Sequence, residues 1–312
     1  MALVLDAPAK LNLYLAVLGR RADGYHDVET ILHEVGLRDT LVAEQMSQPA
    51  SDPIELVVAS DFAGGGTGLP VATGSDNLVC RAARRFFDTV QASRGVRFHL
   101  TKRIPAGGGL GGGSSDAAAA LHLLNVLCGS PLDDAALHAV ASALGADVPF
   151  FLRGGTQLGR GIGTDLTPLE GQLDLHFALI LPPTGTSTRA VYKNHAAHLT
   201  PRTDQTSIPH DEVPAVKEIA VATGFPNDLE ASALQLHPHL SDLRDKVVAL
   251  GCPQVRMSGS GSSFFVACTD EAQCSVALEK LAPMRRDGVA LLQTSTSHSQ
   301  RRPRPGSFPG IH

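Results

Sequence analysis

The sequence predicts an α+β fold with two domains. Stretches with the two-residue alternation of strands and stretches with helical spacing follow one another without strict alternation, which favours α+β over a doubly wound parallel sheet. A stretch rich in Gly and Thr, 154–167, separates the two halves of the chain and places a boundary near residue 158. We therefore expect domains at 1–158 and 159–295, followed by a Pro-, Arg- and Ser-rich tail, 296–312, that is disordered.

The first domain should open with a strand. Apolar residues at positions 11, 13, 15 and 17 alternate with a set that includes Lys10 and Asn12. One face of this strand should be buried, and Lys10 and Asn12 should share the opposite face. The remaining elements are expected as strands at 54–58 and 96–100, helices at 78–90 and 132–144, a helix after the glycines at 107–113, and an exposed loop at 61–75.

The second domain should begin with a strand and continue with helices and short strands. The expected strands are 175–181, 255–257, 264–267 and 288–294, and the expected helical segments are 189–199, 213–223, 228–236, 240–250 and 271–281. A polar linker, 201–211, should separate the first two helical segments.

The composition excludes several classes of protein. The chain has 312 residues, 43% of them hydrophobic, which is enough for a large core in a soluble globular protein. A net charge of −5 gives no basic surface for nucleic acid. Five scattered cysteines without a C-x-x-C pair are typical of a reduced, cytoplasmic protein. The absence of a signal peptide or a membrane-length apolar run indicates no membrane partner.

Six glycines between residues 107 and 113, followed by Ser114, Ser115 and an Ala/Leu-rich run, form the most informative motif. Ser114 or Ser115 is a suitable N-cap for the helix that follows. The glycines would then bring bare backbone N–H groups to the positive end of a helix dipole. Such an arrangement binds anions, most often phosphate.

The motif does not fit the other common phosphate loops. A Walker A loop ends in Gly-Lys-Ser/Thr, whereas Gly113 is followed directly by Ser114. The glycines do satisfy the dinucleotide pattern G-x-G-x-x-G, but the acidic residues at the required distance, Asp133 and Asp134, open another helix. An NAD(P)-dependent oxidoreductase and a glycine-rich turn without a ligand remain as alternatives.

Three polar residues are candidates for chemistry. Asp147 lies among apolar residues in the segment GADVPFF, where partial desolvation can tune a carboxylate as a general base; it could equally be a turn residue after a helix. Lys10 could pair with that carboxylate or with a transferring phosphoryl group, or be a solvated edge lysine. Asn12 could bind a ligand hydroxyl or lie on the surface.

Two further segments could contact a ligand. The turn 20–26 brings Tyr25 beside His26, a pattern that suits a nucleobase pocket but also an ordinary hairpin loop. The Ser/Gly turn 257–263 could admit a phosphate or simply join two strands. The histidine pairs in the second half lack the spacing of a zinc site, so we expect no protein metal ligands.

Taken together, the motifs resemble those of the GHMP kinase superfamily. Three segments appear in the order of its motifs: PAKLNL at 8–13, PAGGGLGGGSS at 105–115 and MSGSG at 257–261. Three more segments resemble the 4-diphosphocytidyl-2-C-methyl-D-erythritol kinases within that superfamily: RADGYH at 21–26, GADVPF at 145–150 and NDLE at 227–230. The resemblance covers about residues 8–294.

This resemblance implies a fold, an activity and a set of roles. The fold would be a two-domain GHMP kinase fold, with an N-terminal ATP-binding domain and a C-terminal α/β sandwich-like domain. The activity would be ATP-dependent phosphorylation of the 2-hydroxyl of 4-diphosphocytidyl-2-C-methyl-D-erythritol in the non-mevalonate isoprenoid pathway, with Asp147 as general base and Lys10 as its electrostatic partner. ATP and Mg²⁺ would be required, the Mg²⁺ being held mostly by ATP and water.

The resemblance also implies binding residues. Those for ATP would be Pro105, Ala106, Gly107, Gly108, Gly109, Leu110, Gly111, Gly112, Gly113, Ser114, Ser115, Asn77 and Lys102. Those for the cytidine substrate would be Asn12, Tyr25, His26 and Tyr192. The partners would be small molecules, and the protein would be a monomer or a homodimer. A GHMP kinase for mevalonate, homoserine or galactose, or a non-catalytic sensor on the same fold, would be the nearest alternative.

Overall fold

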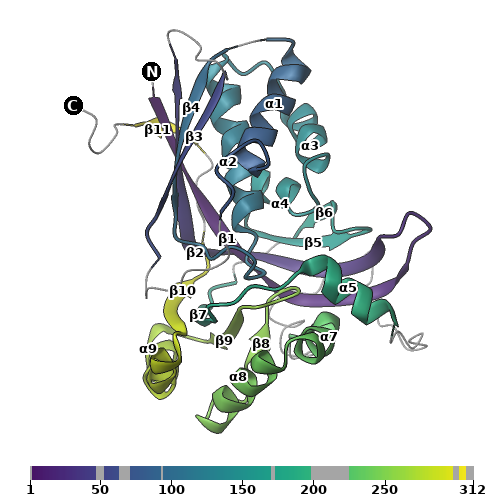
Figure 1. The fold of residues 1–312 in the computed structure, drawn as a ribbon, viewed down its shortest axis with the longest axis vertical. Helices are drawn as coiled ribbons and strands as arrows, with labels where there is room; N and C mark the ends of the chain where they lie inside the picture. Colours follow the sequence, from purple (N-terminus) through teal and green to yellow (C-terminus); the bar gives the residue numbers. More distant parts are fainter. Residues whose placement is uncertain are drawn as a thin grey trace.

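Two sheets and the helices packed on them make up the fold (Figure 1). The computed structural model describes residues 2–46, 53–62, 71–92, 94–169, 173–197, 225–297 and 302–306. Helices and strands of these residues follow one another without strict alternation, so the predicted α+β class is confirmed.

The first sheet has seven strands, of which β1 and β2 are the longest. Its main path is β11-β1-β2-β4-β3, and β5 pairs with the far end of β2 and with β6. The described strand pairs are antiparallel except for β3 with β4. The bounds are β1 (Ala2–Arg20), β2 (His26–Gln45), β3 (Ile54–Ser60), β4 (Val96–Lys102), β5 (Thr156–Arg160), β6 (Asp165–Pro168) and β11 (Arg304–Pro305).

Four helices cover one face of this sheet: α1 (Leu78–Val90), α2 (Gly112–Leu127), α3 (Asp134–Ser142) and α4 (Val148–Arg153). The central one, α2, lies between α1 and the strands β1 and β2. Its run of small residues, Ala117–Ala120, is fully buried, because only short side chains allow a helix to approach neighbours on several sides at once.

The second sheet has the order β10-β7-β9-β8 and lies below the first in Figure 1. Its strands are β7 (His176–Leu181), β8 (Arg256–Met257), β9 (Phe264–Cys268) and β10 (Ala290–Ser295). The accompanying helices are α5 (Thr188–Ala197), α7 (Asp228–Leu236), α8 (Pro238–Ala249), α9 (Glu271–Leu281) and the 3₁₀ helix η1 (Ala282–Asp287). The predicted linker at 201–211 and helix at 213–223 lie outside the described residues.

The strand β1 is buried on both of its faces along its middle, 7–17. One group of its side chains, with Leu11 and Leu13, joins Phe177 and Phe265 of the second sheet in a common apolar cluster, and α2 packs against the same strand. The expectation that Lys10 and Asn12 lie on an open face is therefore wrong. Both are buried, so their polar atoms need partners inside the protein.

Three segments differ from the sequence prediction. The stretch 154–167 forms most of the β5–β6 hairpin, so the first sheet continues past residue 158 to Pro168. The strand β2 was not predicted, because its middle is buried on both faces and lacks a simple two-residue alternation. Part of the tail is ordered, since β11 pairs with β1; residues 298–301 and 307–312 lie outside the described part.

Candidate active site

Lys10 and Asn12 form the buried centre of the candidate site. Lys10 Nζ donates a hydrogen bond to Asn12 Oδ1 and lies 3.8 Å from Asp147 Oδ2. Asn12 Nδ2 donates in turn to Thr30 Oγ1 on β2 at 2.8 Å. Burial lowers the pKa of Lys10, and the negative charge of Asp147 partly opposes that shift. The structure therefore brings together the three residues that the sequence had singled out for chemistry.

Asp147 is the accessible member of this group. Its side chain is 42% exposed, against 5% for Lys10. It stands at the N-cap of α4, yet the structure shows no capping hydrogen bond from its side chain. The carboxylate oxygens of Asp147 are thus accessible to a ligand, and the buried ammonium group of Lys10 lies next to them.

The glycine loop, residues 107–113, packs between β1 and the turn that joins β8 to β9. Leu110 O accepts a hydrogen bond from Lys10 N at 3.0 Å. At Gly109, with φ +75°, a Cβ atom would lie 2.3 Å from Ser258 O. At Gly111, with φ +72°, a Cβ atom would lie 2.7 Å from the Phe151 ring. Glycine is required at both positions by the close approach as well as by the backbone angle.

The helix α2 begins earlier than predicted. Its N-cap is Gly111 and its first residue is Gly112, so neither Ser114 nor Ser115 is the cap. The geometry of an α-helix leaves the N–H groups of its first turn without acceptors inside the helix, here at Gly112, Gly113 and Ser114. Gly107 and Gly113 are exposed, and this end of α2 therefore fits the predicted phosphate site.

Ser115 lies deeper than the rest of the loop. Its side chain is fully buried, and its Oγ has no hydrogen-bond partner among the described residues. The hydroxyl can serve a ligand only if the loop moves or the ligand reaches inward. Ser114 is half-buried, as are Pro105 and Ala106 at the start of the loop.

The Ser/Gly turn 257–263 is the third segment of the site and contacts both β1 and the glycine loop. Asn12 N donates to Ser258 Oγ at 3.3 Å, and Ser258 Oγ donates to Gly109 O at 3.1 Å. One hydroxyl thus links the first strand, the glycine loop and the turn. The three motifs, which lie about a hundred residues or more apart in the sequence, meet in one place.

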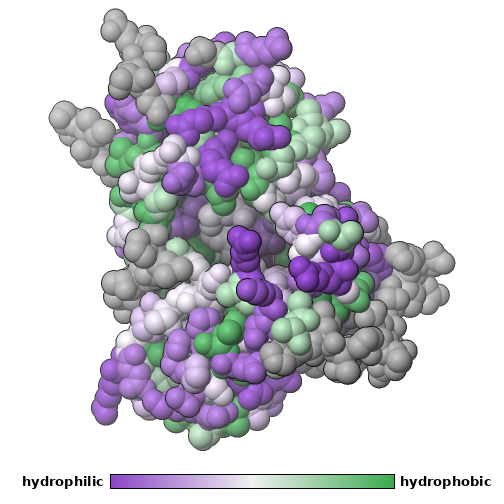
Figure 2. Space-filling model, turned by 45° about the vertical axis from the view of Figure 1, so that its right-hand side comes forward, coloured by the Kyte–Doolittle hydropathy of each residue, from purple (hydrophilic) through white to green (hydrophobic). Residues whose placement is uncertain are grey.

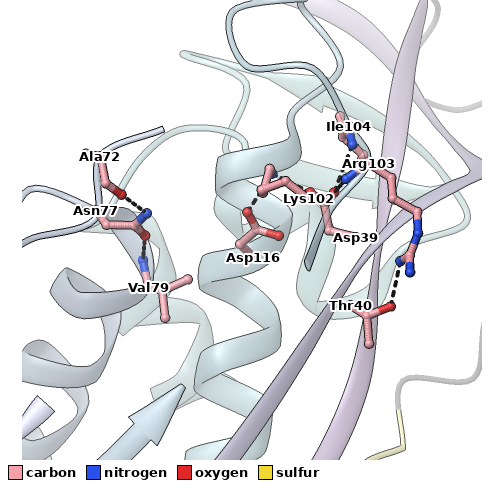
Figure 3. A network of polar contacts seen from close by, with 9 residues as sticks. All are labelled: Asp39, Thr40, Ala72, Asn77, Val79, Lys102, Arg103, Ile104 and Asp116. Atoms are coloured by element: carbon pink, nitrogen blue, oxygen red, sulfur yellow. Dashed lines mark hydrogen bonds and ion pairs between the residues drawn. The ribbon is translucent and has the colours of Figure 1, made fainter. Parts of the chain in front are cut away.

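Lys102 lies against the start of α2, where a Cβ atom added at Gly112 would lie 3.1 Å from its Nζ. Its side chain is buried, and its Nζ binds the carboxylates of Asp39 and Asp116 (Figure 3). Asp39 also accepts hydrogen bonds from the backbone N–H groups of Arg103 and Ile104. Lys102 thus links β2, β4 and the N-terminal half of α2, and its contact with ATP stays a prediction.

Asp116 has a strongly raised pKa in this cluster. Burial raises its pKa to about 8, with Lys102 opposing the shift and Asp39 adding to it. For Lys102 burial acts to lower the pKa, but the two carboxylates outweigh it and the pKa is raised. Two carboxylates share one ammonium group here, so a proton on Asp116 leaves the cluster neutral.

Asn77, expected near adenine, is the N-cap of α1. Its Oδ1 accepts from Val79 N at 2.8 Å and its Nδ2 donates to Ala72 O at 2.7 Å (Figure 3). One end of the amide therefore caps the helix, and the other holds the segment that precedes it. A nucleotide that approaches Asn77 would find both polar atoms of its side chain already in hydrogen bonds.

The predicted base-binding residues come from two elements. His26, at the start of β2, stacks on Tyr192 of α5 with the ring centroids 5.2 Å apart and an angle of 30° between the planes. Burial, the charge of Arg20 and that of His195 lower the pKa of His26, which favours its neutral form. Tyr25 is 62% exposed. Burial, followed by the charge of Asp147, raises the pKa of Tyr192.

The surface is hollowed between the two halves of the molecule (Figure 2), with hydrophilic side chains beside the hollow. Thr30 and Asp39 of β2 take part in the networks above, and sequence reasoning missed both. No local signal marks them, because their partners come from strand register and not from spacing. No helix among the described residues is both long and apolar enough to cross a membrane.

Comparisons with known proteins decide the family. The family model described as "GHMP kinases N terminal domain" matches residues 77–155, and "GHMP kinases C terminal" matches residues 213–283. The 4-diphosphocytidyl-2-C-methyl-D-erythritol kinase of Methylobacterium radiotolerans is 41% identical over 276 residues, covering 86% of this chain and 91% of that protein. This chain belongs to the GHMP kinase family. It is an ATP-dependent small-molecule kinase.

Other relatives agree with this placement. The enzyme of the same name from Pelotomaculum thermopropionicum is 35% identical to this GHMP kinase over 95% of this chain and 98% of its own. The crystal structure of a 4-(cytidine 5'-diphospho)-2C-methyl-D-erythritol kinase superposes with a TM-score of 0.70 at 35% identity, covering 94% of this chain and 99% of that chain. The homoserine kinase of Cytophaga hutchinsonii has a TM-score of 0.65 at 19% identity, over 97% and 96% of the two chains, and shares the fold.

Replacing Gly111 by Ala should damage the site directly. The new Cβ would meet the Phe151 ring at 2.7 Å and Lys10 Cγ at 3.1 Å, so the loop or Lys10 must shift. We expect kcat/KM for ATP to fall by on the order of 10²-fold, the scale set by small misplacements in active sites. Gly129→Ala is the matched control, since Gly129 has φ +84° and no described atom within 4 Å of an added Cβ. Equal kinetics for the two variants would contradict the prediction.

Asp116→Asn should change how stability depends on pH. The folded-state pKa of Asp116 is raised to about 8, so its protonation favours the folded state at low pH, and this contribution declines as pH rises from the unfolded pKa, about 4, towards 8. The variant lacks this decline. Relative to wild type, its free energy of unfolding should rise between pH 5 and pH 8 and then level off, as urea titrations at several pH values would measure. A pH-independent difference would rule out the raised pKa.

Proposed function

We propose that this GHMP kinase transfers the γ-phosphoryl group of ATP to the 2-hydroxyl of 4-diphosphocytidyl-2-C-methyl-D-erythritol. The observation that carries the chemistry is the half-exposed Asp147 carboxylate with the buried Lys10 ammonium 3.8 Å away, next to the glycine loop. The substrate is argued from relatives named for this activity that match over most of their length and from the ring stack that could hold a base.

Asp147 is the proposed general base. It would accept the proton of the substrate hydroxyl as that oxygen bonds to the γ-phosphorus and the bond to the leaving ADP breaks. Lys10 would favour the ionised carboxylate and offset the negative charge that develops on the attacking oxygen. Asn12 supports this role by holding Lys10 Nζ from the other side.

The end of α2 is the proposed site for the ATP phosphates. The N–H groups at Gly112, Gly113 and Ser114 lack helical acceptors, and the glycines at 107–111 let phosphate oxygens come close to the backbone. Mg²⁺ would be held there mostly by oxygens of ATP and by water, since no group of three or more His, Cys, Asp or Glu side chains among the described residues could hold a metal ion. Bound there, the ion would neutralise phosphate charge.

The stack of His26 on Tyr192 is the proposed site for the cytosine ring. A base can insert beside these rings or lie on the exposed ring of Tyr25. The neutral imidazole favoured at His26 has one donor and one acceptor nitrogen, which suits the mixed polar edge of cytosine. The Nε2 atom of His26 is buried and has no hydrogen-bond partner among the described residues.

Asp147→Asn should remove the base while keeping the shape of the site. We expect kcat to fall by about 10²–10⁴-fold, the range for loss of a general base, with KM for ATP nearly unchanged. Asp133→Asn is the matched control, because Asp133 is an N-cap on α3 and Asn caps a helix equally well. Steady-state kinetics of both variants decide the matter, and a near-normal rate for Asp147→Asn removes Asp147 as the base.

Tyr25→Ala should weaken binding of the cytidine substrate. Stacking of a base on an aromatic ring is worth about 1–3 kcal/mol, so KM for the substrate should rise several-fold to about a hundred-fold while kcat and the melting temperature change little. Tyr25→Phe keeps the ring and should retain most of the affinity. An unchanged KM in Tyr25→Ala would refute the stacking role.

The test of the whole proposal is a panel of acceptors. The purified protein would be incubated with Mg²⁺-ATP and, in turn, 4-diphosphocytidyl-2-C-methyl-D-erythritol, mevalonate, homoserine and galactose, and ADP release would be followed. ADP with the cytidine compound alone is the expected result. ADP with another acceptor would overturn the proposed substrate, and ATP binding without turnover on any acceptor would favour a sensor.

A further inference from the structure

The segment 226–230 is attached to β1 just beyond the candidate site. Leu15 N donates to Pro226 O at 3.0 Å, and Val17 N donates to Asp228 Oδ2 at 2.9 Å. Both bonds use the strand that carries Lys10 and Asn12, at positions three to seven residues further along the chain. The segment therefore lies in a fixed register on that strand.

The same segment holds the turn between β8 and β9. Asn227 Nδ2 donates to Met257 O at 2.9 Å and to Gly259 O at 2.7 Å, while its Oδ1 caps α7 by accepting from Leu229 N at 3.0 Å. Glu230 Oε2 accepts from Met257 N at 3.0 Å. Both amide protons and the amide oxygen of Asn227 are used. A carboxylate would lack the two donors, and a serine side chain is shorter and has a single donor.

The turn rests directly on the buried pair. At Gly259, with φ +58°, a Cβ atom would lie 2.9 Å from Asn12 Oδ1 and 3.4 Å from Lys10 Nζ. Since not even a methyl group fits between the turn and the pair, moving the turn towards them must displace one of these two side chains, and moving it away leaves a gap. The position of Lys10 relative to Asp147 is thus linked to the two carbonyl groups that Asn227 holds.

We infer that Asn227 is a positioning residue for phosphoryl transfer: it fixes the Gly259 backbone against Lys10 and Asn12 and so sets the place of the Lys10 ammonium. The inference rests on the proposed roles of Lys10 and Asp147. Asn227 acts through the turn, with its two amide protons on Met257 and Gly259. Its contribution is to geometry, and its loss should lower the rate more than it lowers the binding of ATP.

Asn227→Asp is the first variant to make. It keeps the size of the side chain and the oxygen that caps α7, and it replaces two donors by a carboxylate that faces two carbonyl oxygens. Asn125→Asp is the matched control, because Asn125 also binds backbone on both sides, at Leu132 O and Leu132 N, but lies near the end of α2 away from the glycine loop. We expect kcat of Asn227→Asp to fall by on the order of 10–10²-fold, the scale of a small misplacement in an active site, with a smaller change in KM for ATP. The control should lose stability and keep its kcat.

Asn227→Ser is the second variant, since serine preserves a good helix cap and protects the test against a failure to fold. Hydrogen exchange gives a readout that needs no acceptor: exchange of 257–263 and of the strand around Lys10 should accelerate in both Asn227 variants and stay unchanged in Asn125→Asp. A kcat loss no larger than that of the control, or unchanged exchange at 257–263, overturns the inference. A wild-type protein without turnover on the cytidine acceptor contradicts the proposed function, and the exchange comparison then decides the inference by itself.

Discussion

The burial of the Lys10 ammonium is the constraint on which the candidate site depends. A charged group taken out of water is costly unless polar partners replace the water. Asn12 and Asp147 supply those partners, and Thr30 fixes Asn12 in turn. The arrangement depends on a strand buried on both faces, and β1 is covered by α2 and by residues of the second sheet. The geometry of the candidate site therefore depends on how the second sheet packs against the first.

The glycines follow from the same constraint. The Lys10 side chain, the glycine loop and the turn 257–263 lie against one another, and no room is left for further side chains on the loop or the turn at the points of contact. At Gly109, Gly111 and Gly259 an added Cβ would collide with backbone, with a ring or with the Lys10–Asn12 pair. Close packing alone therefore requires glycine at these three positions. The motifs are far apart in the sequence because three separate segments of the chain come into contact at this point.

Much of this arrangement could be predicted from the sequence, and the rest depended on tertiary contacts. The helices at 78–90, 228–236 and 271–281 were predicted at their observed bounds, because each has caps and spacing that act locally. The Lys10–Asp147 pairing was predicted through motif resemblance. Strand β2 and its Asp39 were missed because their environment is set by neighbours distant in sequence. The two buried carboxylates that bind Lys102 were missed for the same reason, because Asp39 and Asp116 reach it only through tertiary contacts.

Comparison of Lys10 with Lys102 shows that the fold gives two buried ammonium groups different surroundings. Both ammonium groups are buried close to the glycine loop, and burial acts to lower both pKa values. Lys102 has two buried carboxylates, which outweigh that effect and raise its pKa. Lys10 has one half-exposed carboxylate, and its pKa stays lowered. The charge of Lys102 is fully satisfied inside the protein, whereas that of Lys10 is only partly neutralised. A partly neutralised ammonium group beside an open carboxylate is the arrangement on which the proposed role of Lys10 rests.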